Sequence, residues 1–469
     1  MRRFLEIVFC FGILSYMQMA TAQITLPPII GDGMVIQRGI EFPVWGWAKA
    51  GQKVQIKPNW QSGITATANH EGRWFVKIAA PPAGGPYELQ IKGDNTVIAI
   101  RDILCGEVWL ACGQSNMEMP LGNISSDNYP GIDNYRQEIA EANYPSIRFF
   151  TPAYKKKHMP QTEFDGRWVL CSPESAKYFS AVEYFFGRRL HKELKVPIGL
   201  INSSFGGSYI EEWMTKQTLQ AYPDCSLPAE RSDYPLYDVL IAPLIPYGIR
   251  GVILYQGESN ATRAYQYNTL FSAMIHSWRK KWSQGDFPFY FVQIAPCGNN
   301  RYPPMAAAEL RQAQLLTHLA VPNTGMVVTT DLVDDPCAAS PDDLHPGNKQ
   351  DVGKRLALWA LAKTYGRDIA YSGPLYRSFK IEGNKIRLCF EHTDGGLIAA
   401  GNGLGGFSIA GADKQFADAK AEIDGNTVVV WSEKVQEPNS VRFGWDNVPQ
   451  PSLFNAAGLP ASPFCTNKQ

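Results

Sequence analysis

Short runs of alternating apolar and polar residues fill positions 23–100 and predict β-strands. The alternation is clear at 53–56, 74–78 and 87–91, and Gly- and Pro-rich stretches such as 81–86 separate the runs. An alternating strand buries only one of its faces, so strands of this kind pack together in facing sheets. We therefore expect a small β-sandwich domain over residues 23–100.

The rhythm changes near residue 101, where apolar runs begin to alternate with stretches of helical spacing. Buried strands are predicted at 196–201, 251–255, 289–294 and 326–329, and amphipathic helices at 179–194, 270–282 and 352–360. Strands that alternate with helices favour a doubly wound, mostly parallel sheet. We therefore expect an α/β domain over residues 101–366, with the aromatic and leucine side chains of its helices in the core.

A second β region is predicted after residue 366. Helical spacing stops there, strands are predicted at 385–390 and 427–431, and glycines dominate the connections. Residues 367–469 either form an independent β domain or complete the N-terminal sandwich, and the pattern does not choose between them.

The first 22 residues have the pattern of an export signal. Residues 1–3 are basic at two positions, 7–19 are largely apolar, and Ala20-Thr21-Ala22 is an Ala-x-Ala cleavage site. The apolar stretch is short for a membrane anchor and contains polar residues. We expect residues 1–22 to be a signal peptide and the mature chain to be periplasmic or secreted, because no later segment is apolar enough to span a bilayer.

Charge and cysteine content narrow the classes of function. The 469-residue chain has 44 Lys and Arg against 44 Asp and Glu, so its formal net charge is zero. A neutral chain gives no electrostatic case for binding nucleic acid or an anionic membrane. Of the nine cysteines, Cys10 lies in the export signal, and the others lack the spacing of a metal site. We expect some buried thiols, and one or two disulfides are compatible with export.

The candidate chemistry begins at Ser115, which follows the apolar run 107–110 and a break at Gly113. Open α/β sheets bind ligands at the carboxyl ends of their strands, so a serine there can meet a substrate. A serine hydroxyl needs a base to take its proton, and His345 is the candidate among only seven histidines. Asp342, three residues earlier, can orient the imidazole and stabilise the imidazolium.

Two further segments follow predicted strands and supply groups for an ester-hydrolysing site. An oxyanion hole needs two or three donors aimed at one point. The backbone N–H groups of Ser115 and Gly207 are two candidates, and the side-chain amide of Gln256 is a third. Glu258 has two possible roles: it replaces Asp342 as the acid of the triad, or it braces the loop that carries the serine.

The sequence does not call for a metal or an organic cofactor. Glu211-Glu212 has no histidine at ligand spacing, and neither Gly-x-x-x-x-Gly-Lys nor a Gly-x-Gly-x-x-Gly after a strand is present. We therefore expect chemistry by side chains alone, with no metal and no cofactor.

Four ordered motifs together resemble the SGNH hydrolase superfamily, specifically its sialate O-acetylesterase-like branch of carbohydrate esterases. They are Gly113-Gln114-Ser115-Asn116-Met117, Phe205-Gly206-Gly207-Ser208, Gln256-Gly257-Glu258-Ser259-Asn260 and Asp342-Asp343-Leu344-His345. The stretch 455–464 also looks like the tail of these proteins. In the third motif the wider superfamily has Gly-x-Asn-Asp, which differs from the sequence here.

The resemblance implies a flavodoxin-like SGNH hydrolase domain with accessory N- and C-terminal β-sandwich-type regions. It also implies a secreted serine esterase that removes O-acetyl groups from sialic acids through an acetyl-enzyme. Acetylated xylan or another acetylated sugar is the nearest alternative substrate.

Residues that could contact the sugar lie in or near the same motifs. A sialic acid carboxylate suits the planar fork of an arginine, and Arg263, Arg301 and Arg311 are candidates. Of these arginines we select Arg311, and the other candidate substrate contacts are Gln114, Asn116, Glu258 and Asn260. The alternative function is glycan binding by an inactive hydrolase domain, motivated by the tryptophans of the first β region and opposed by the intact serine–histidine–acid set.

Overall fold

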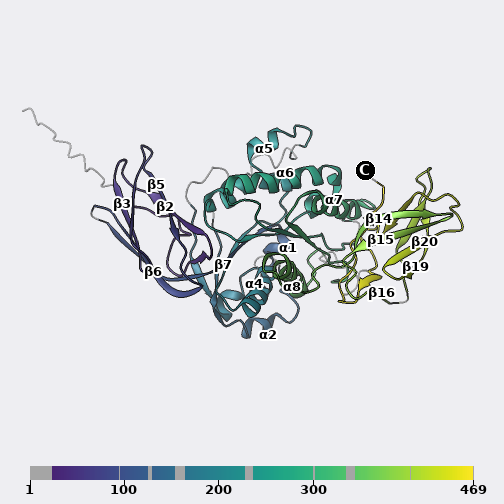
Figure 1. Ribbon diagram of the computed structural model, residues 1–469, viewed down its shortest axis with the longest axis horizontal. Helices are drawn as coiled ribbons and strands as arrows, with labels where there is room; N and C mark the ends of the chain where they lie inside the picture. Colours follow the sequence, from purple (N-terminus) through teal and green to yellow (C-terminus); the bar gives the residue numbers. More distant parts are fainter. Residues whose placement is uncertain are drawn as a thin grey trace, which may run out of the picture.

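The computed structural model describes residues 24–467, apart from 95, 125–128, 154–163, 226, 228–235, 299–300, 334–343 and 402. Three regions follow one another along the long axis of the molecule (Figure 1): a β region, a central α/β domain and a second β region. The expected signal peptide and Asp342 lie outside the described residues.

The first β region contains the predicted alternating strands. In β5, every second side chain is buried, and buried residues of both its sheets share one hydrophobic cluster. β2 and β5 form one antiparallel pair, and β4, β3 and β6 form part of a larger sheet. The strands are β1 (Val35–Gln37), β2 (Glu41–Trp47), β3 (Lys53–Pro58), β4 (Ile64–Thr67), β5 (Arg73–Ala79) and β6 (Gly84–Lys92).

The central domain alternates strands and helices as predicted. Its strands are β7 (Val97–Gly113), β8 (Tyr144–Phe150), β9 (Trp168–Cys171), β10 (Ile198–Ser204), β11 (Gly251–Tyr255), β12 (Phe289–Val292) and β13 (Thr324–Val327). Its α-helices are α1 (Ser115–Glu118), α2 (Tyr135–Ala140), α3 (Pro173–Ala176), α4 (Ala181–Leu194), α5 (Lys216–Gln220), α6 (Ala264–Trp282), α7 (Ala306–Ala320) and α8 (Lys349–Trp359). Short 3-10 or π segments are η2 (Ile210–Trp213), η4 (Tyr237–Ile241), η5 (Ala242–Leu244), η6 (Glu258–Arg263) and η7 (Ala360–Thr364).

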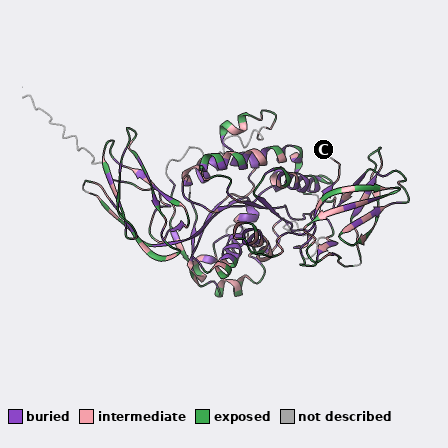
Figure 2. Ribbon diagram, in the orientation of Figure 1, coloured by how far each residue is buried: buried purple, intermediate pink, exposed green. Residues whose placement is uncertain are grey.

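The central sheet runs in the order β13-β12-β11-β7-β10-β8-β9, and its pairs are parallel except β8–β9. Helices cover both faces (Figure 1), α6 and α7 on one and α4 and α8 on the other. Alternate side chains of β7 point to opposite faces of the sheet. Val108 and Leu110 belong to the hydrophobic cluster that includes α6. Trp109 and Ala111 belong to a second cluster, which includes α4 and α8. Figure 2 shows the buried residues concentrated along this sheet.

The strand β7 belongs to both the first β region and the central sheet. Its outer part pairs antiparallel with β6, and its middle pairs parallel with β1, where Val35 is opposite Leu104. Its inner part pairs parallel with β10 on one side and β11 on the other. The boundary expected between residues 100 and 101 therefore falls inside a continuous strand.

The second β region lies at the opposite end of the molecule from the first (Figure 1). None of its described strands pairs with the first region, so it does not complete the N-terminal sandwich, which was one of two expectations. Its sheets have the orders β14-β15-β20-β19, β18-β17-β21-β23 and β16-β22. The strands are β14 (Leu375–Glu382), β15 (Lys385–Glu391), β16 (Leu397–Ala399), β17 (Phe407–Ala410), β18 (Ala417–Asp418), β19 (Lys420–Asp424), β20 (Thr427–Trp431), β21 (Ser440–Phe443), β22 (Leu453–Asn455) and β23 (Phe464–Cys465).

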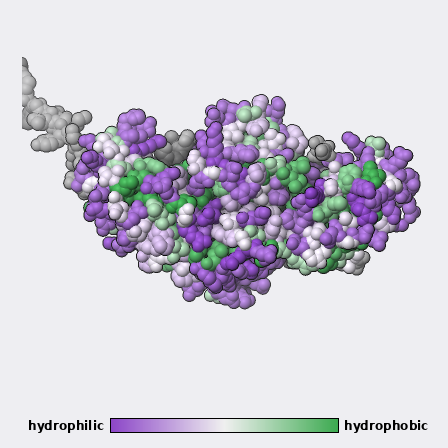
Figure 3. Space-filling model, viewed as in Figure 1, coloured by the Kyte–Doolittle hydropathy of each residue, from purple (hydrophilic) through white to green (hydrophobic). Residues whose placement is uncertain are grey.

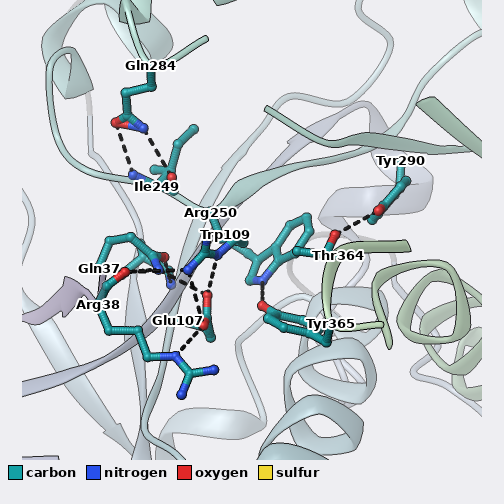
Figure 4. Close-up of polar contacts among 11 residues, drawn as sticks. Gln37, Arg38, Glu107, Trp109, Ile249, Arg250, Gln284, Tyr290, Thr364 and Tyr365 are labelled. Carbon is teal, nitrogen blue, oxygen red and sulfur yellow. Dashed lines mark hydrogen bonds and ion pairs between the residues drawn. The ribbon is translucent and has the colours of Figure 1, made fainter. Parts of the chain in front are cut away.

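A buried carboxylate, Glu107, ties the first β region to the central sheet (Figure 4). Its oxygens accept hydrogen bonds from Gln37 Nε2 at 3.0 Å, Arg38 Nε at 2.5 Å and Arg250 Nε at 2.7 Å. The side chain of Gln37 also accepts from the backbone N–H of Val108 at 2.8 Å. A buried charge needs such pairing and hydrogen bonding to be tolerated. The cluster therefore joins β1, β7 and the start of β11 at one point.

The seven cysteines that the structure describes are all free, and five of them are buried. The one or two disulfides that export would allow therefore do not form among them, and Cys337 lies outside the described residues. No helix within the described ranges is long and apolar enough to cross a bilayer. Figure 3 shows apolar residues as separate patches among hydrophilic ones on the face in view.

Candidate active site

Three loops meet at the carboxyl end of β7 because of the strand register. Gly113, the last residue of β7, is opposite Ser204 at the end of β10 and Tyr255 at the end of β11. The motifs that follow these residues therefore begin at one level of the sheet. β10 and β11 are successive strands on opposite sides of β7, and such a switch in strand order opens a crevice where open α/β sheets bind ligands.

Gly113 and Gln114 make the turn that presents Ser115 at the start of α1. Gly113 has φ +137°, and a Cβ there would lie 2.1 Å from the carbonyl oxygen of Tyr255, so glycine is required. Gln114, expected to contact substrate, is 2% exposed. Its Oε1 accepts from the backbone N–H of Gly257 at 3.2 Å, which braces the turn from the neighbouring loop.

Ser115 and His345 lie in hydrogen-bond contact. Nε2 of His345 is 2.7 Å from Oγ of Ser115. An imidazole in this position can take the hydroxyl proton as the oxygen attacks. The ring of Tyr129 packs edge-on against the imidazole, with the ring centroids 5.8 Å apart. The two residues that the sequence placed at the centre of the chemistry are therefore brought together by the fold.

Glu258, the alternative acid, is 6% exposed and hydrogen-bonded to the serine loop. Nδ2 of Asn116 donates to its Oε1 at 2.6 Å, and its Oε2 has no hydrogen-bond partner among the described residues. Burial raises the pKa of this carboxyl, and its hydrogen bonds and the charge of Lys349 oppose the rise. These contacts suit bracing of the serine loop, one of the two roles expected for Glu258.

The glycine loop after β10 lies against the serine. A Cβ on Gly206 would be 3.7 Å from Cβ of Ser115 and 2.9 Å from a carboxylate oxygen of Glu118. Gly207 has φ +69°, which favours glycine. The backbone N–H of Phe205 donates to the carbonyl oxygen of Gly113 at 2.8 Å, so the glycine loop is held against the carboxyl end of β7.

Gln256, expected as an oxyanion donor, and Asn260, expected as a substrate contact, instead hold the glycine loop through hydrogen bonds. Gln256 is fully buried, and its Nε2 donates to the carbonyl oxygen of Ser208 at 3.1 Å and to Oδ1 of Asn260 at 3.0 Å. Its Oε1 accepts from Tyr267 at 2.7 Å, and Asn260 donates to Glu211 at 2.9 Å. Because both amide hydrogens of Gln256 are already donated, neither is aimed at an acyl oxygen here.

Arg311 does not meet the expectation that it faces a substrate carboxylate. The side chain is fully buried, and its guanidinium donates to the carbonyl oxygens of Ile294, Ala295, Asp446 and Asn447 at 2.8–3.0 Å. Burial lowers the pKa of Arg311 to about 10. The sequence prediction was wrong because it could not show that backbone carbonyls of the loop after β12 and of the second β region would surround this arginine.

One charged residue of the site, Lys349, was missed by the sequence reasoning. It begins α8, is fully buried, and donates from Nζ to Oδ1 of Asn116 at 2.6 Å. Burial lowers the pKa of Lys349 to about 7, and the charge of Glu258 opposes that shift. A lysine in the first turn of a helix opposes the helix dipole, and that misplaced charge was the signal available in the sequence.

A serine paired with an imidazole at the carboxyl edge of an α/β sheet defines a hydrolase of the serine type. The family described as carbohydrate esterase, sialic acid-specific acetylesterase matches residues 105–361. This chain belongs to that family and is an esterase.

Individual relatives agree with this assignment. The sialate O-acetylesterase of Homo sapiens is 30% identical over 400 residues, which cover 76% of this chain and 74% of that protein. That of Mus musculus is 30% identical over 425 residues, covering 75% and 76%. The crystal structure of a carbohydrate acetylesterase from Xanthomonas citri is 38% identical, with a TM-score of 0.85 over 95% of this chain and 100% of that one.

Proposed function

We propose that this protein hydrolyses O-acetyl esters on sialic acids. The observation that carries the proposal is the 2.7 Å contact between His345 Nε2 and Ser115 Oγ, because it makes the serine a usable nucleophile. The family and the names of the mammalian relatives support sialic acid as the sugar. Another acetylated carbohydrate, such as acetylxylan, is the second candidate, because the Xanthomonas citri relative is described only as a carbohydrate acetylesterase.

The proposed mechanism is acyl transfer in two steps. Ser115 Oγ attacks the acetyl carbonyl while His345 takes its proton, and the imidazolium then protonates the departing sugar oxygen. A water molecule, deprotonated by His345, attacks the acetyl-enzyme and releases acetate. The backbone N–H groups of Ser115 and Gly207 are the proposed oxyanion donors, and a single such donor contributes about a hundredfold to a thousandfold in rate.

The acid of the triad is proposed to be Asp342, with Glu258 as the alternative. The contacts of Glu258 with Asn116 support a bracing role, which favours Asp342. Three of the four motifs follow the aligned ends of β7, β10 and β11 in chain order, which supports the finer assignment of the central domain to the SGNH hydrolase type.

Three variants test the mechanism. Ser115→Ala should lower kcat for p-nitrophenyl acetate by about a thousandfold or more, and a variant that kept full activity would refute it. Asp342→Asn and Glu258→Gln should then be compared as folded proteins. The larger loss of kcat identifies the acid, and we expect it for Asp342→Asn.

The sugar is tested by release of acetate from 9-O-acetyl sialic acid and from acetylated xylan. A higher kcat/KM for the sialic acid supports the proposal, and the reverse order assigns the protein to xylan. Of the remaining arginine candidates for the carboxylate, Arg263 is paired with Glu211 at 2.7 Å, whereas Arg301 is exposed.

We also propose export of the mature chain, supported by the sequence of residues 1–22. Cell fractionation with N-terminal sequencing tests it: a mature chain that begins at Gln23 outside the cytoplasm is expected, and an uncleaved cytoplasmic chain would contradict it.

A further inference from the structure

A buried bridge of side chains joins the loops on either side of the serine–histidine contact. Asn116, the residue after the serine, donates from Nδ2 to Oε1 of Glu258 at 2.6 Å and to the carbonyl oxygen of Leu344 at 2.9 Å. Its Oδ1 accepts from Nζ of Lys349 at 2.6 Å. Leu344 is the residue before the histidine. The bridge therefore runs from the neighbour of the nucleophile to the neighbour of the base.

Lys349 determines which way the amide of Asn116 points. In its protonated form Lys349 is an ammonium group, which only donates, so the amide oxygen of Asn116 faces it. The carbonyl oxygen of Leu344 only accepts, so the amide NH₂ group faces Leu344 and, beside it, Glu258. The reversed amide would set NH₂ against the ammonium group and oxygen against two acceptors. Lys349 thus strongly favours the one orientation that ties the two loops together.

Packing alone does not account for a lysine at this position. Its side chain is fully buried and lies in the first turn of α8, where the helix dipole disfavours a positive charge. The groups that face it are the carboxylates of Glu258, on η6, and Asp133, before α2, and the ring of Tyr255, on β11, whose centroid is 5.7 Å away. Costly buried charges of this kind concentrate at functional sites.

We propose that Lys349 is a positioning residue for ester hydrolysis, which acts through Asn116 to hold the His345 loop at hydrogen-bonding distance from Ser115. The inference rests on the proposed roles of the serine and the histidine. A displacement of about 1 Å between reacting groups can cost about a hundredfold in rate, so the fixing of this loop has a measurable consequence.

The sharpest test compares Lys349→Met with Lys349→Gln. Both variants remove the same buried charge, but only glutamine retains an N–H that can donate to Oδ1 of Asn116. Active sites are counted with a serine-reactive fluorophosphonate, so unfolded chains do not contribute. For p-nitrophenyl acetate we expect Lys349→Met to lower kcat about a hundredfold with KM unchanged, and Lys349→Gln to keep about ten times more activity.

A double variant tests the path through Asn116. Adding Lys349→Met to Asn116→Ala should lower kcat by less than about threefold further, because residues that act as one unit are not additive. Lys354→Met, at an exposed position on the same helix, is the matched control and should keep wild-type kcat.

Three results would overturn the inference: equal kcat for the methionine and glutamine variants, wild-type kcat in Lys349→Met, or multiplicative losses in the double variant. The proposed function fails separately, if the wild-type protein has no esterase activity or if Ser115→Ala keeps it.

Discussion

Replacing Arg311 by methionine should loosen the attachment of the second β region and leave the chemistry intact. Methionine fills a similar volume, but it leaves the carbonyl oxygens of Ile294, Ala295, Asp446 and Asn447 without their present donor. Two of these carbonyls belong to the loop after β12 and two belong to the second β region. The substitution therefore removes a connection between two parts of the chain that are far apart in sequence.

The size of the effect follows from the four hydrogen bonds. A hydrogen bond to a charged group contributes about 1.5–3 kcal/mol, and an unsatisfied buried carbonyl costs about 1–3 kcal/mol. The four values do not add, because the bonds share one guanidinium and Asp446 is exposed, so water can replace part of them. Methionine also avoids the cost of burying a charge. We expect a net loss of about 3–5 kcal/mol in the free energy of unfolding.

Urea denaturation and limited proteolysis measure this change. Arg311→Met should unfold at a lower urea concentration than the wild type. Proteases should also cut it more rapidly between the central domain and the second β region. Arg311→Lys keeps the charge but cannot reach four carbonyls. Its free energy of unfolding should therefore lie between those of Arg311→Met and the wild type. A loss below about 1 kcal/mol would refute the reasoning. A tenfold rise in KM for acetylated sialic acid with unchanged stability would instead place Arg311 at the substrate.

Three further predictions concern the carboxylates and the glycine loop. Glu107→Ala leaves two guanidinium groups without their buried partner and should cost about 3–5 kcal/mol, measured by urea denaturation; a loss below about 1 kcal/mol would contradict it. Gly206→Ala places a methyl group 2.9 Å from a carboxylate oxygen of Glu118, so the groups beside Ser115 must shift, and kcat/KM should fall about tenfold with an unchanged circular dichroism spectrum. Glu258 has a raised pKa, so the folded state binds its proton more tightly than the unfolded state, and this carboxyl makes stability fall as pH rises above its usual range. In urea denaturation, Glu258→Gln should therefore gain stability relative to wild type as pH rises above about 4, and a constant difference would show that folding does not raise the pKa of this carboxyl.

A helix or strand could be predicted where the spacing of its apolar residues stays the same from one end to the other. The strands predicted at 251–255 and 427–431 have the same bounds as β11 and β20. The length of β7 could not be predicted in this way, because its burial changes from partial to complete near Ile103. A change of pattern inside one strand looks like a domain boundary in the sequence. Only the pairing partners show that the strand continues.

Site residues could be predicted where the residue type and its neighbours in the sequence together indicate a catalytic role. Ser115 and His345 carried such motifs and lie 2.7 Å apart. Arg311 and Gln256 could not be placed, because their partners include backbone carbonyls, which every residue has. For Arg311, two of these carbonyls lie more than a hundred residues away. A polar residue type gives no sign of whether it faces a ligand or supports a loop.

The strand β7 also sets an order of events during synthesis. Its outer part leaves the ribosome after β1 and β6, so partners for it already exist. Its inner part is apolar and must wait for β10 and β11 to be translated. At about 5–20 residues per second, the nascent chain carries at least one unpaired edge of this strand for roughly 7–30 seconds. A fragment that stops soon after Gly113 would expose the same apolar edges permanently, so the first β region is poorly suited to expression by itself.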